Sequence, residues 1–466
     1  MTRAFKRWPA LLVLTTLLAA CGGAPASKPT TAPAATAVPA ATAASAATVP
    51  AATAAITTTA AITATAAITA TAAITATAAI TATAAITATA AITATAATTD
   101  KAYVFGMVLV GPINDGGWNQ AQYEGMKYVE ARIPGSKFIY VDKVNPADRP
   151  NTKVEQAIDE LIAQGAAFVV TNSADFGDGT TIAAKANPKV FFIHASGDAV
   201  LSGKAPANVG NIMGRMEYGK MIAGCAAALQ TATGKISYLG PLIDSETRRL
   251  VNAAFLGAKH CWTDVRGKPA DQLSFKVTWI GFWSNIPGVT LDPTQVANDF
   301  INGGSDVIIS GIDTTEAIVE ASKATKAGKK IYAIPYDFKG ACEQAPDVCL
   351  GVPYFNWGPS YLKVIGDAKA GTFTQSWNWI APDWTNINNP DTSIVGFEKG
   401  AALSTENQAK LDEFIKKLAD GSLNLYTGPI SYQDGKPFVA AGATADDKTV
   451  WYTAQLLKGV EGQSAP

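Results

Sequence analysis

Charge is scarce in this sequence, and histidine is almost absent. Only 16% of the 466 residues are charged, the formal net charge is −1, and the two histidines, His194 and His260, lie far apart in the chain. A near-neutral chain without a basic stripe lacks the electrostatic features of nucleic-acid binding. The HExxH motif of zinc proteases and the GxSxG motif of serine hydrolases are both missing. We therefore expect no nucleic-acid partner, no metal and no cofactor.

A complete phosphate-binding loop is also missing. Residues 214–221 read GRMEYGKM, but Met221 stands where a Ser or Thr would hold magnesium, so we expect no nucleotide hydrolysis. Carboxylates of the kind that glycosidases use in pairs occur at Asp115, Asp175, Asp313 and Asp337. Carboxylates at strand ends also accept hydrogen bonds or cap helices. We therefore favour a ligand-binding protein that is not an enzyme.

The N-terminus has no apolar run long enough to cross a bilayer, which takes roughly 20 residues. Three basic residues precede a shorter apolar run at residues 10–20, a pattern typical of a signal peptide. The run ends in Leu-Ala-Ala-Cys, which resembles the bacterial lipobox, with an ordinary cleavage site and an incidental cysteine as the alternative. The resemblance implies removal of residues 1–20 and lipid on Cys21. Lipid alone would then hold the protein on the extracytoplasmic face of the cell membrane.

The next segment, residues 21–101, is built from Ala, Thr and Pro with almost no charge and no aromatic residue. An Ile recurs every six residues from Ile56 to Ile92, which does not match a helical stripe. Low complexity of this kind cannot offset its ordering entropy, so we interpret the segment as a disordered tether. A weak Ala-rich helix is the alternative, and it would still be a spacer. The many threonines would permit O-glycosylation.

From residue 102 onward, short apolar runs alternate with amphipathic stretches of helical period. Strands separated by helices of this length predict parallel βαβ units, and continuous apolar runs are typical of a sheet covered on both faces. The predicted fold is α/β, with two doubly wound Rossmann-like lobes joined by hinge segments. We assign 102–211 with 338–378 to lobe 1, and 212–337 with 379–462 to lobe 2. The predicted strands are 103–111, 137–142, 168–173, 190–197, 235–242, 275–283, 306–313 and 330–337.

The ends of these strands are rich in aromatic and acidic residues. Ligands of open parallel sheets lie beyond the carboxyl ends of the strands, and two facing lobes would place these groups around one cleft. Trp118 stands out, because two glycines precede it in the stretch NDGGWNQ. That context favours a ring presented to a ligand, with core packing as the alternative. The strand ends are Asn114–Trp118, Asn172–Phe176, Ser196–Asp198, Leu242–Glu246, Phe282–Asn285, Gly311–Thr314 and Tyr336–Phe338.

Taken together and in order, several stretches of residues 102–462 resemble the basic membrane protein family. This family comprises substrate-binding lipoproteins of ABC importers, of the purine-receptor type, and the resemblance is to its adenine-binding branch. It implies a type I periplasmic binding protein, a purine base or nucleoside as ligand, an ABC permease as partner and a monomer. Receptors for nucleosides usually carry Phe where this chain has Trp118. The matching stretches include VGPINDGGWNQAQYEG, AIDELIAQGAAFVVTNS, NVGNIMGRMEYGKMIAG, VANDFINGGSDVIISGID, FNWGPSY, GPISYQDGKP and LLKGVEG.

A purine is apolar on its faces and polar on its edge, so aromatic rings should stack on the faces while carboxylates bind the edge. We predict that Trp118 and Phe176 from lobe 1 and Trp283 from lobe 2 hold the base. Asp313 and Asp337 would accept hydrogen bonds from it. Weaker candidates are Glu246 and the pair Asn356 and Trp357, which could instead only pack the hinge. A sugar or amino acid as ligand, a glycosidase-like enzyme and a purely structural surface lipoprotein are the competing hypotheses.

Five cysteines are present, and four remain for pairing once Cys21 is set aside, which allows three arrangements. Cys342 and Cys349 flank the short polar loop CEQAPDVC, so we favour that pair as a disulfide. A Cys225–Cys261 pair would follow by elimination, with buried free thiols as the alternative.

We predict that Cys342–Cys349 is oxidised in the exported protein. Closing this loop restricts the unfolded chain and stabilises the fold by on the order of a few kcal/mol in the chain-entropy model, less if the bond is strained. Peptide mapping without reductant should recover both cysteines in one linked peptide. Recovery of two free thiols would contradict the prediction.

Overall fold

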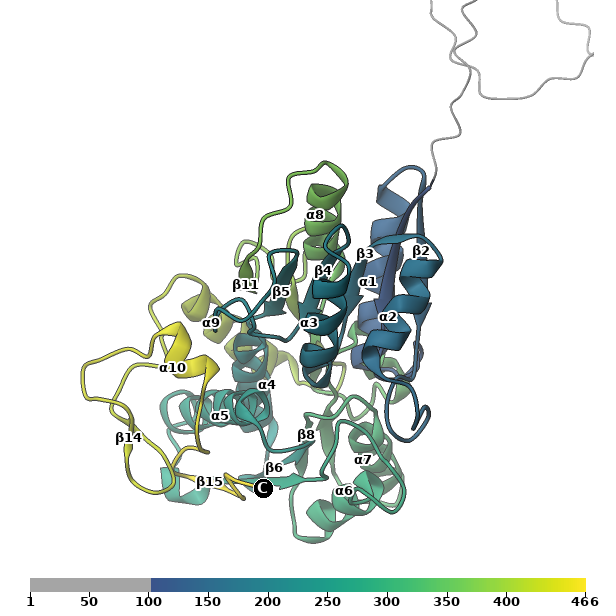
Figure 1. Cartoon of the computed structure of the whole chain (residues 1–466). Coiled ribbons are helices and arrows are strands. Elements are labelled where there is room, and N and C mark those ends of the chain that lie inside the picture. The colour runs from purple at the N-terminus through teal and green to yellow at the C-terminus, as the bar shows by residue number, and fades with distance from the viewer. Residues whose placement is uncertain (1–101) are drawn as a thin grey trace, which may run out of the picture. The chain divides into compact units, whose positions relative to one another are not determined.

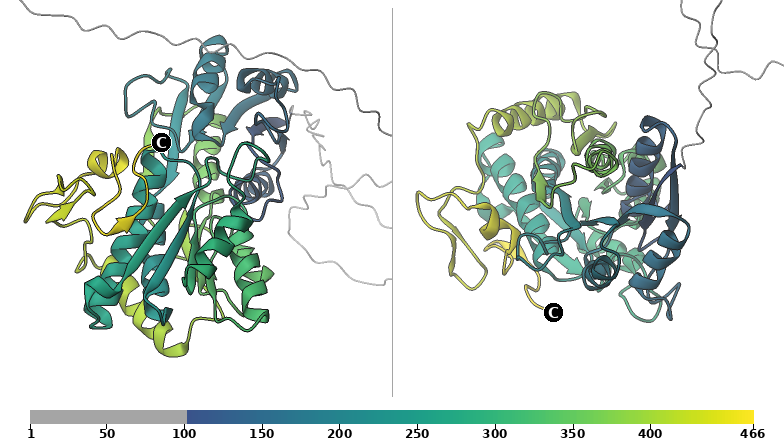
Figure 2. Two further views of the ribbon diagram at one scale, coloured as in Figure 1. Left: turned by 90° about the horizontal axis from the view of Figure 1, so that it is seen from below. Right: turned by 45° about the horizontal axis from the view of Figure 1, so that its top comes forward.

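The computed structural model describes residues 102–466, so the predicted signal peptide, the lipidation site at Cys21 and the tether lie outside the described residues. The described chain forms two parallel sheets, each with helices on both faces (Figures 1 and 2). We call the first sheet with its helices lobe 1 and the second with its helices lobe 2. The sheet of lobe 1 has the order β11-β5-β4-β3-β1-β2. Its strands are β1 (Tyr103–Val108), β2 (Ser136–Val141), β3 (Ala166–Thr171), β4 (Phe191–Ala195), β5 (Val209–Gly214) and β11 (Trp377–Ile380).

The sheet of lobe 2 has the order β15-β7-β6-β8-β9, and all of its pairings are parallel. All eight strands predicted from the apolar runs are present, four in each sheet. The central strands are buried throughout, which explains why their sequences are apolar without alternation. The strands of lobe 2 are β6 (Lys235–Gly240), β7 (Ser274–Trp279), β8 (Val307–Ser310), β9 (Tyr332–Ile334) and β15 (Val460–Glu461).

Helices connect the strands and cover the sheets. In lobe 1, α1 packs on α8 and α2 on α3; in lobe 2, α4 packs on α5 and α6 on α7. The helices are α1 (Trp118–Arg132), α2 (Val154–Ala163), α3 (Gly177–Ala186), α4 (Met216–Gln230), α5 (Ser245–His260), α6 (Pro293–Asn302), α7 (Glu316–Lys326), α8 (Gly358–Lys369), α9 (Thr405–Ala419) and α10 (Asp447–Trp451). Short helical turns are η1 (Ala174–Phe176), η2 (Cys261–Val265), η3 (Ala270–Gln272) and η4 (Lys339–Gln344).

Strand β5 is not among the predicted strands, because it lies in the stretch NVGNIMGRME, which the apolar pattern marks as the break between the two halves. The strand is fully buried, and its glycines are required by its neighbours. A Cβ on Gly214 would lie 2.6 Å from Val395 Cγ2, and one on Gly210 would lie 2.9 Å from Ile193 Cδ1. Close packing therefore requires glycine at these two positions, and glycine weakens the sequence pattern from which a strand is predicted. The first sheet ends one strand later than predicted.

The chain passes between the two sheets after β5, between β9 and β11, and again after β11. Two antiparallel pairs accompany these passages: β10 (Gly351–Phe355) with β12 (Val395–Lys399), and β13 (Ile430–Ser431) with β14 (Pro437–Val439). The C-terminal segment, yellow in Figure 1, runs past α5 and ends as β15 beside β7. The exact division of residues between the lobes stays a prediction.

Both cysteine pairs are bonded in the structure, Cys342 with Cys349 and Cys225 with Cys261. The second pair joins α4 to the end of α5, two helices that already pack along their length. Oxidation of these pairs in the exported protein remains for experiment.

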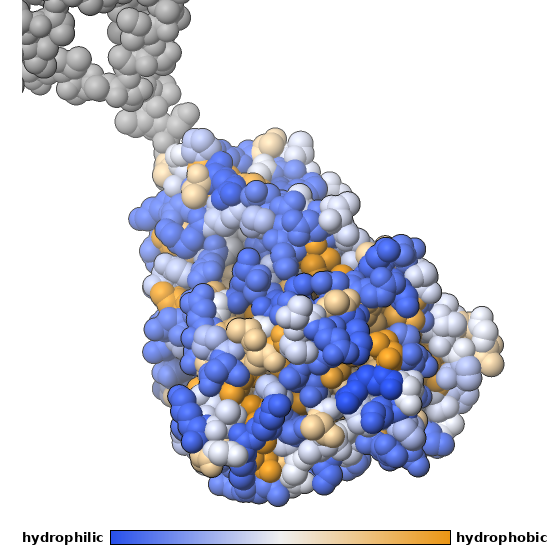
Figure 3. Space-filling view, turned by 180° about the vertical axis from the view of Figure 1, so that it is seen from behind, coloured by the Kyte–Doolittle hydropathy of each residue, from blue (hydrophilic) through white to orange (hydrophobic). Residues whose placement is uncertain are grey.

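The surface is mainly hydrophilic on the face shown in Figure 3, where hydrophobic residues lie in small separate groups. Large exposed hydrophobic residues among those described are Tyr140, Ile182, Val289, Leu291 and Tyr452. Between residues 102 and 466, none of the helices has the length and apolar character needed to cross a membrane.

Candidate functional site

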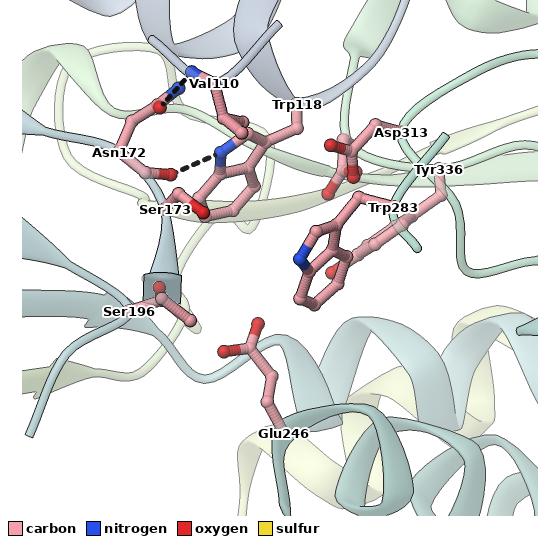
Figure 4. Close-up of a pocket in the computed structure, with 11 residues that line it drawn as sticks. Val110, Trp118, Asn172, Ser173, Ser196, Glu246, Trp283, Asp313 and Tyr336 are labelled. Carbon is pink, nitrogen blue, oxygen red and sulfur yellow. Dashed lines mark hydrogen bonds between the residues drawn. The ribbon is translucent and has the colours of Figure 1, made fainter. Parts of the chain in front are cut away.

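A cavity with about 340 Å³ of empty space lies between the two lobes (Figure 4). Its lining comes from segments that follow the carboxyl ends of β1, β3, β4, β6, β7, β8 and β9, as the topology of parallel sheets predicts. Only about 20 Å³ of it can hold the centre of a water molecule, so the lobes are closed on the site and a ligand would need them to move apart. The lining residues are Val110, Trp118, Asn172, Ser173, Ala174, Ser196, Glu246, Trp283, Asp313, Tyr336 and Asp337.

The first wall is made by the turn that precedes α1. Asp115 holds this turn by accepting hydrogen bonds from the backbone N–H groups of Gly117, Asn119 and Gln120, at 2.9, 2.9 and 3.0 Å. A carboxylate here also interacts favourably with the positive end of the helix dipole. Asp115 is thus a helix-capping residue, and Trp118 becomes the first residue of the helix.

The Trp118 ring is held on several sides. Its Nε1 donates to the backbone oxygen of Asn172 at 2.7 Å, and its edges meet the rings of Phe355 and Trp357 at centroid distances of 5.4 and 5.3 Å. Asn172 is itself fixed, since its Oδ1 accepts from Val110 N and its Nδ2 donates to Asn119 Oδ1. The ring is therefore 8% exposed yet borders the cavity as a rigid surface.

Asp313 and Asp337 form the acidic side of the cavity. They follow β8 and β9, which are neighbours in the sheet of lobe 2. Neither side-chain oxygen of Asp337 accepts a hydrogen bond from any residue in the described part of the chain. Burial, and then the charge of the partner carboxylate, raises the pKa of Asp313 well above its usual range. Burial also raises the pKa of Asp337, against the opposing charge of Lys220.

Lys220 is a fully buried basic residue whose positive charge acts on Asp337. Its Nζ donates to the backbone oxygen of Ser310 at 2.7 Å and lies 3.2 Å from the centroid of the Tyr336 ring. Burial lowers the pKa of Lys220 well below its usual range. Lys220 does not line the cavity, so it can influence a ligand only through the groups that do.

Glu246 approaches from the other side of the cavity. It lies in the first turn of α5, where Asp244 caps the helix, and its carboxylate points toward Ser196 and Trp283 (Figure 4). Burial raises the pKa of Glu246 to about 7, even though Arg249 Nη2 lies 3.7 Å from its Oε2 and lowers that pKa. The carboxyl group therefore changes its charge near neutral pH.

Backbone strain is concentrated at the cavity. Non-glycine residues with positive φ in the described part of the chain are Lys143, Ser196 and Asp337, and the last two line the cavity. Such conformations cost on the order of 1–3 kcal/mol each and persist where the surroundings enforce them. The backbone conformation of Asp337 is held by β10, because the Asp337 N–H donates to Pro353 O and the Asp337 carbonyl accepts from Phe355 N. The strain fixes the direction of the Asp337 carboxylate.

The two lobes touch through their backbones beside the cavity. A Cβ on Gly117 of lobe 1 would lie only 1.9 Å from the carbonyl oxygen of Asp313 in lobe 2. A Cβ on the preceding Gly116, whose φ is +75°, would meet Thr315 and Gln344 at 3.1 and 3.2 Å. The two glycines before Trp118 are thus needed for the approach of the lobes as well as for the turn.

The structure brings together five of the predicted ligand-binding residues: Trp118, Glu246, Trp283, Asp313 and Asp337. Three others lie outside the cavity. Phe176 is turned into the core of lobe 1 by η1, so the adjacent Ala174 takes its place in the lining. Asn356 uses its Nδ2 to donate to Pro390 O and Ser393 O. Trp357 is fully buried behind Trp118, stacked between Phe355 and Tyr361.

Sequence reasoning missed six lining residues, and five of them follow strand ends that it had identified. It favoured aromatic and acidic side chains at those ends and passed over a buried amide, two hydroxyls, an alanine and a tyrosine. Val110 carried no signal, because it continues the apolar run of β1. The missed residues are Val110, Asn172, Ser173, Ala174, Ser196 and Tyr336.

Comparison with known proteins gives a consistent result. The family model Bmp, described as "ABC transporter substrate-binding protein PnrA-like", matches residues 102–381. A purine-binding protein of Brucella abortus (strain 2308) is 28% identical over 357 residues, which cover 76% of this chain and 92% of that protein. A Haloferax volcanii ABC transporter protein, TsgA13, assigned to glucose binding, is 27% identical over 218 residues, covering 47% of this chain and 50% of that protein.

The fold is also that of solved binding proteins. A solute-binding protein of an ABC transporter system from Aeropyrum pernix K1 superposes with a TM-score of 0.55 at 13% identity, covering 74% of this chain and 95% of that one. The predicted class, α/β with two Rossmann-like lobes of the type I periplasmic binding protein kind, is confirmed.

We predict that Gly117→Ala prevents full closure of the lobes. The added methyl group would overlap the Asp313 carbonyl, a backbone atom that cannot move aside cheaply. Small-angle X-ray scattering of the full-length chain should report a larger radius of gyration for this variant than for the parent. Gly366→Ala is the control, because a Cβ there meets nothing within 4 Å. Equal radii for all three proteins would contradict the prediction.

We predict that Glu246 lowers the stability of the ligand-free protein as the pH rises from about 4.5 to about 7. The folded state keeps a proton on Glu246 in this range, whereas the unfolded chain releases it near 4.5, so rising pH favours unfolding. The raised pKa values of Asp313 and Asp337 act in the same direction. Urea titrations at several pH values should give a smaller slope for Glu246→Gln. An unchanged slope would show that Glu246 ionises normally in the folded state.

Proposed function

The chain belongs to the Bmp family of PnrA-like ABC transporter substrate-binding proteins, and from this premise we propose that it captures a purine, with adenine as the preferred base. Members of this family are extracytoplasmic and deliver a small molecule to a transporter. The observation that carries the proposal is the pair of buried carboxyl groups, Asp313 and Asp337, beside the Trp118 ring.

The carboxyl pair supports a ligand with hydrogen-bond donors on one edge. A carboxylate has acceptor oxygens only, and a buried carboxylate without a partner is costly. A ligand that brings N–H groups would meet both needs. Adenine presents an exocyclic amine, whereas the oxopurines carry a carbonyl oxygen at that position, which a carboxylate would repel, so they could meet the acidic side only through another edge. The acidic edge therefore favours an aminopurine.

The aromatic walls support a flat ligand. Trp118 belongs to lobe 1 and Trp283 to lobe 2, and the two side chains border one small cavity. Stacking of a base on an aromatic side chain contributes about 1–3 kcal/mol. A planar ring between Trp118 and Trp283 would gain stacking energy from both lobes. Ligand binding would therefore favour closure of the two lobes.

A sugar is the second candidate, and the glucose-binding assignment of the Haloferax relative is the observation that favours it. Tryptophan faces and carboxylates also suit sugars. A sugar, however, carries hydroxyl groups around its whole ring, and the lining here places Val110, Ala174 and two tryptophans on much of the perimeter. The purine-binding relative also aligns over a larger part of this chain.

The rest of the proposed function concerns where the protein acts. We propose that lipid on Cys21 anchors it to the extracytoplasmic face of the cell membrane, and that it acts as a monomer. Its partner is the permease of the ABC importer that the family implies. A lipid anchor would keep the binding protein near that permease without a membrane-spanning helix.

We predict that adenine raises the thermal stability of the protein. A ligand at a hundredfold excess over its dissociation constant stabilises the folded state by about 2.7 kcal/mol. Adenine should give a clear shift in melting temperature, hypoxanthine a smaller one, and glucose and amino acids none. A shift with glucose alone would overturn the purine assignment and leave the fold intact.

Calorimetry on variants should then locate the purine. Trp118→Ala should weaken adenine binding at least about tenfold, since stacking of 1–3 kcal/mol corresponds to roughly 5–150-fold. Trp118→Phe should retain most of the affinity, and Asp313→Asn should reduce it. Trp384→Ala and Asp264→Asn are matched controls, because neither residue lines the cavity. Parent-like affinity for both Trp118→Ala and Asp313→Asn would show that the purine binds elsewhere.

A further inference from the structure

The cavity opens into a second space, which we call the outer compartment. It has about 1330 Å³ of empty space, part of it open to solvent. Ala174, Ser196 and Glu246 line both spaces, so they form the neck between them. Asp198 of lobe 1 and Tyr452 of the C-terminal segment both line the outer compartment. A ligand leaving the inner cavity through this neck would pass these two residues.

The C-terminal segment, residues 447–464, is fixed to lobe 2; we call it the strap. Arg248 of α5 donates to Thr453 O and Ser464 O, each at 3.0 Å. Asn252 of the same helix donates to Gln455 O and accepts from Leu457 N. β15 in the strap also extends the sheet of lobe 2 beside β7. The strap therefore moves with lobe 2.

The same strap reaches lobe 1 at two places. The Tyr452 hydroxyl donates to Asp198 Oδ2 at 2.8 Å, just after β4. A tyrosine hydroxyl keeps its proton at neutral pH, and partial burial and this hydrogen bond raise the pKa of Tyr452 further, to about 12. Trp451 packs edge-on against Trp377 and Trp379 of β11 at centroid distances of 5.0 and 5.1 Å.

The tryptophan contact lies close to the point where the chain passes from lobe 1 to lobe 2, whereas the Tyr452–Asp198 contact lies away from it. Trp379 lies under the Arg215 guanidinium, and Arg215 is the residue between β5 and α4, where the chain leaves lobe 1. Rotation of the lobes about that passage moves the tryptophans little. The Tyr452–Asp198 contact lies on the outer compartment, away from the passage, and opening of the cleft would break it.

We propose that the outer compartment is the route by which the ligand enters and leaves, and that the Tyr452–Asp198 hydrogen bond is a latch across it. This inference rests on the proposed function for its ligand. Tyr452 is 45% exposed although it is a large side chain, which fits a group held at a rim and not in a core. It also lies beyond residue 381, where the match to the family model ends. The latch is therefore a device of this chain's C-terminal segment.

The test measures adenine release from the full-length chain by stopped-flow fluorescence. Loss of this solvent-exposed hydrogen bond should raise the dissociation rate of Tyr452→Phe by about two- to tenfold, with little effect on association. Asp198→Ala, which removes the acceptor, should do the same, and the double variant should release no faster than either single variant. Tyr128→Phe is the matched control, because Tyr128 donates to Asp391 Oδ1 at the same 2.8 Å and neither residue lines the outer compartment.

A second readout does not depend on the identity of the ligand. In the ligand-free chain, Tyr452→Phe should speed hydrogen–deuterium exchange in residues 311–315, which closure presses against Gly117. The control Tyr128→Phe should leave that exchange unchanged. A parent protein that does not bind adenine would refute the proposed function, and the exchange measurement would still decide the latch. Parent-like release and exchange in Tyr452→Phe would overturn the latch alone.

Discussion

The site depends on one constraint, the burial of two carboxyl groups at the ends of adjacent strands. Burial raises the pKa of both Asp313 and Asp337, and among residues 102–466 none donates a hydrogen bond to the Asp337 carboxyl group. β10 holds Asp337 in a strained conformation, and the charge of Lys220 partly opposes the rise in the pKa of Asp337. The cavity is thus prepared for a donor before a ligand arrives.

The fold could be read from the sequence to a large extent, because parallel strands buried on both faces leave continuous apolar runs. Eight strands of the two sheets carried that signal. β5 did not, since Gly210 and Gly214 are demanded by side chains from distant segments, Ile193 and Val395. β11 and β15 are short strands at the edges of their sheets, and their pairing depends on tertiary contacts that no local pattern records.

The site was predictable where topology alone determines position. Carboxyl ends of strands converge, so Trp118, Asp313 and Asp337 could be placed together before any coordinates. The direction in which each side chain points was not predictable from the sequence. Phe176 has the same kind of position as Trp118, but the 3-10 turn capped by Ser173 rotates it into the core. The roles of buried amides depend on hydrogen-bond partners far apart in sequence, and these emerge only from the folded chain.

The contact between Gly117 and the Asp313 carbonyl has a further consequence. A meeting of two backbones cannot repack as side chains can, so it is a mechanical stop for the hinge. The width of the gap between the walls that carry Trp118 and Trp283 is therefore set by the main chain. For the proposed purine, this stop would allow the lobes to close on a flat ring, whereas a puckered ring would hold them further apart. The main chain would then limit the thickness of the ligand, and the side chains would select its hydrogen-bonding groups.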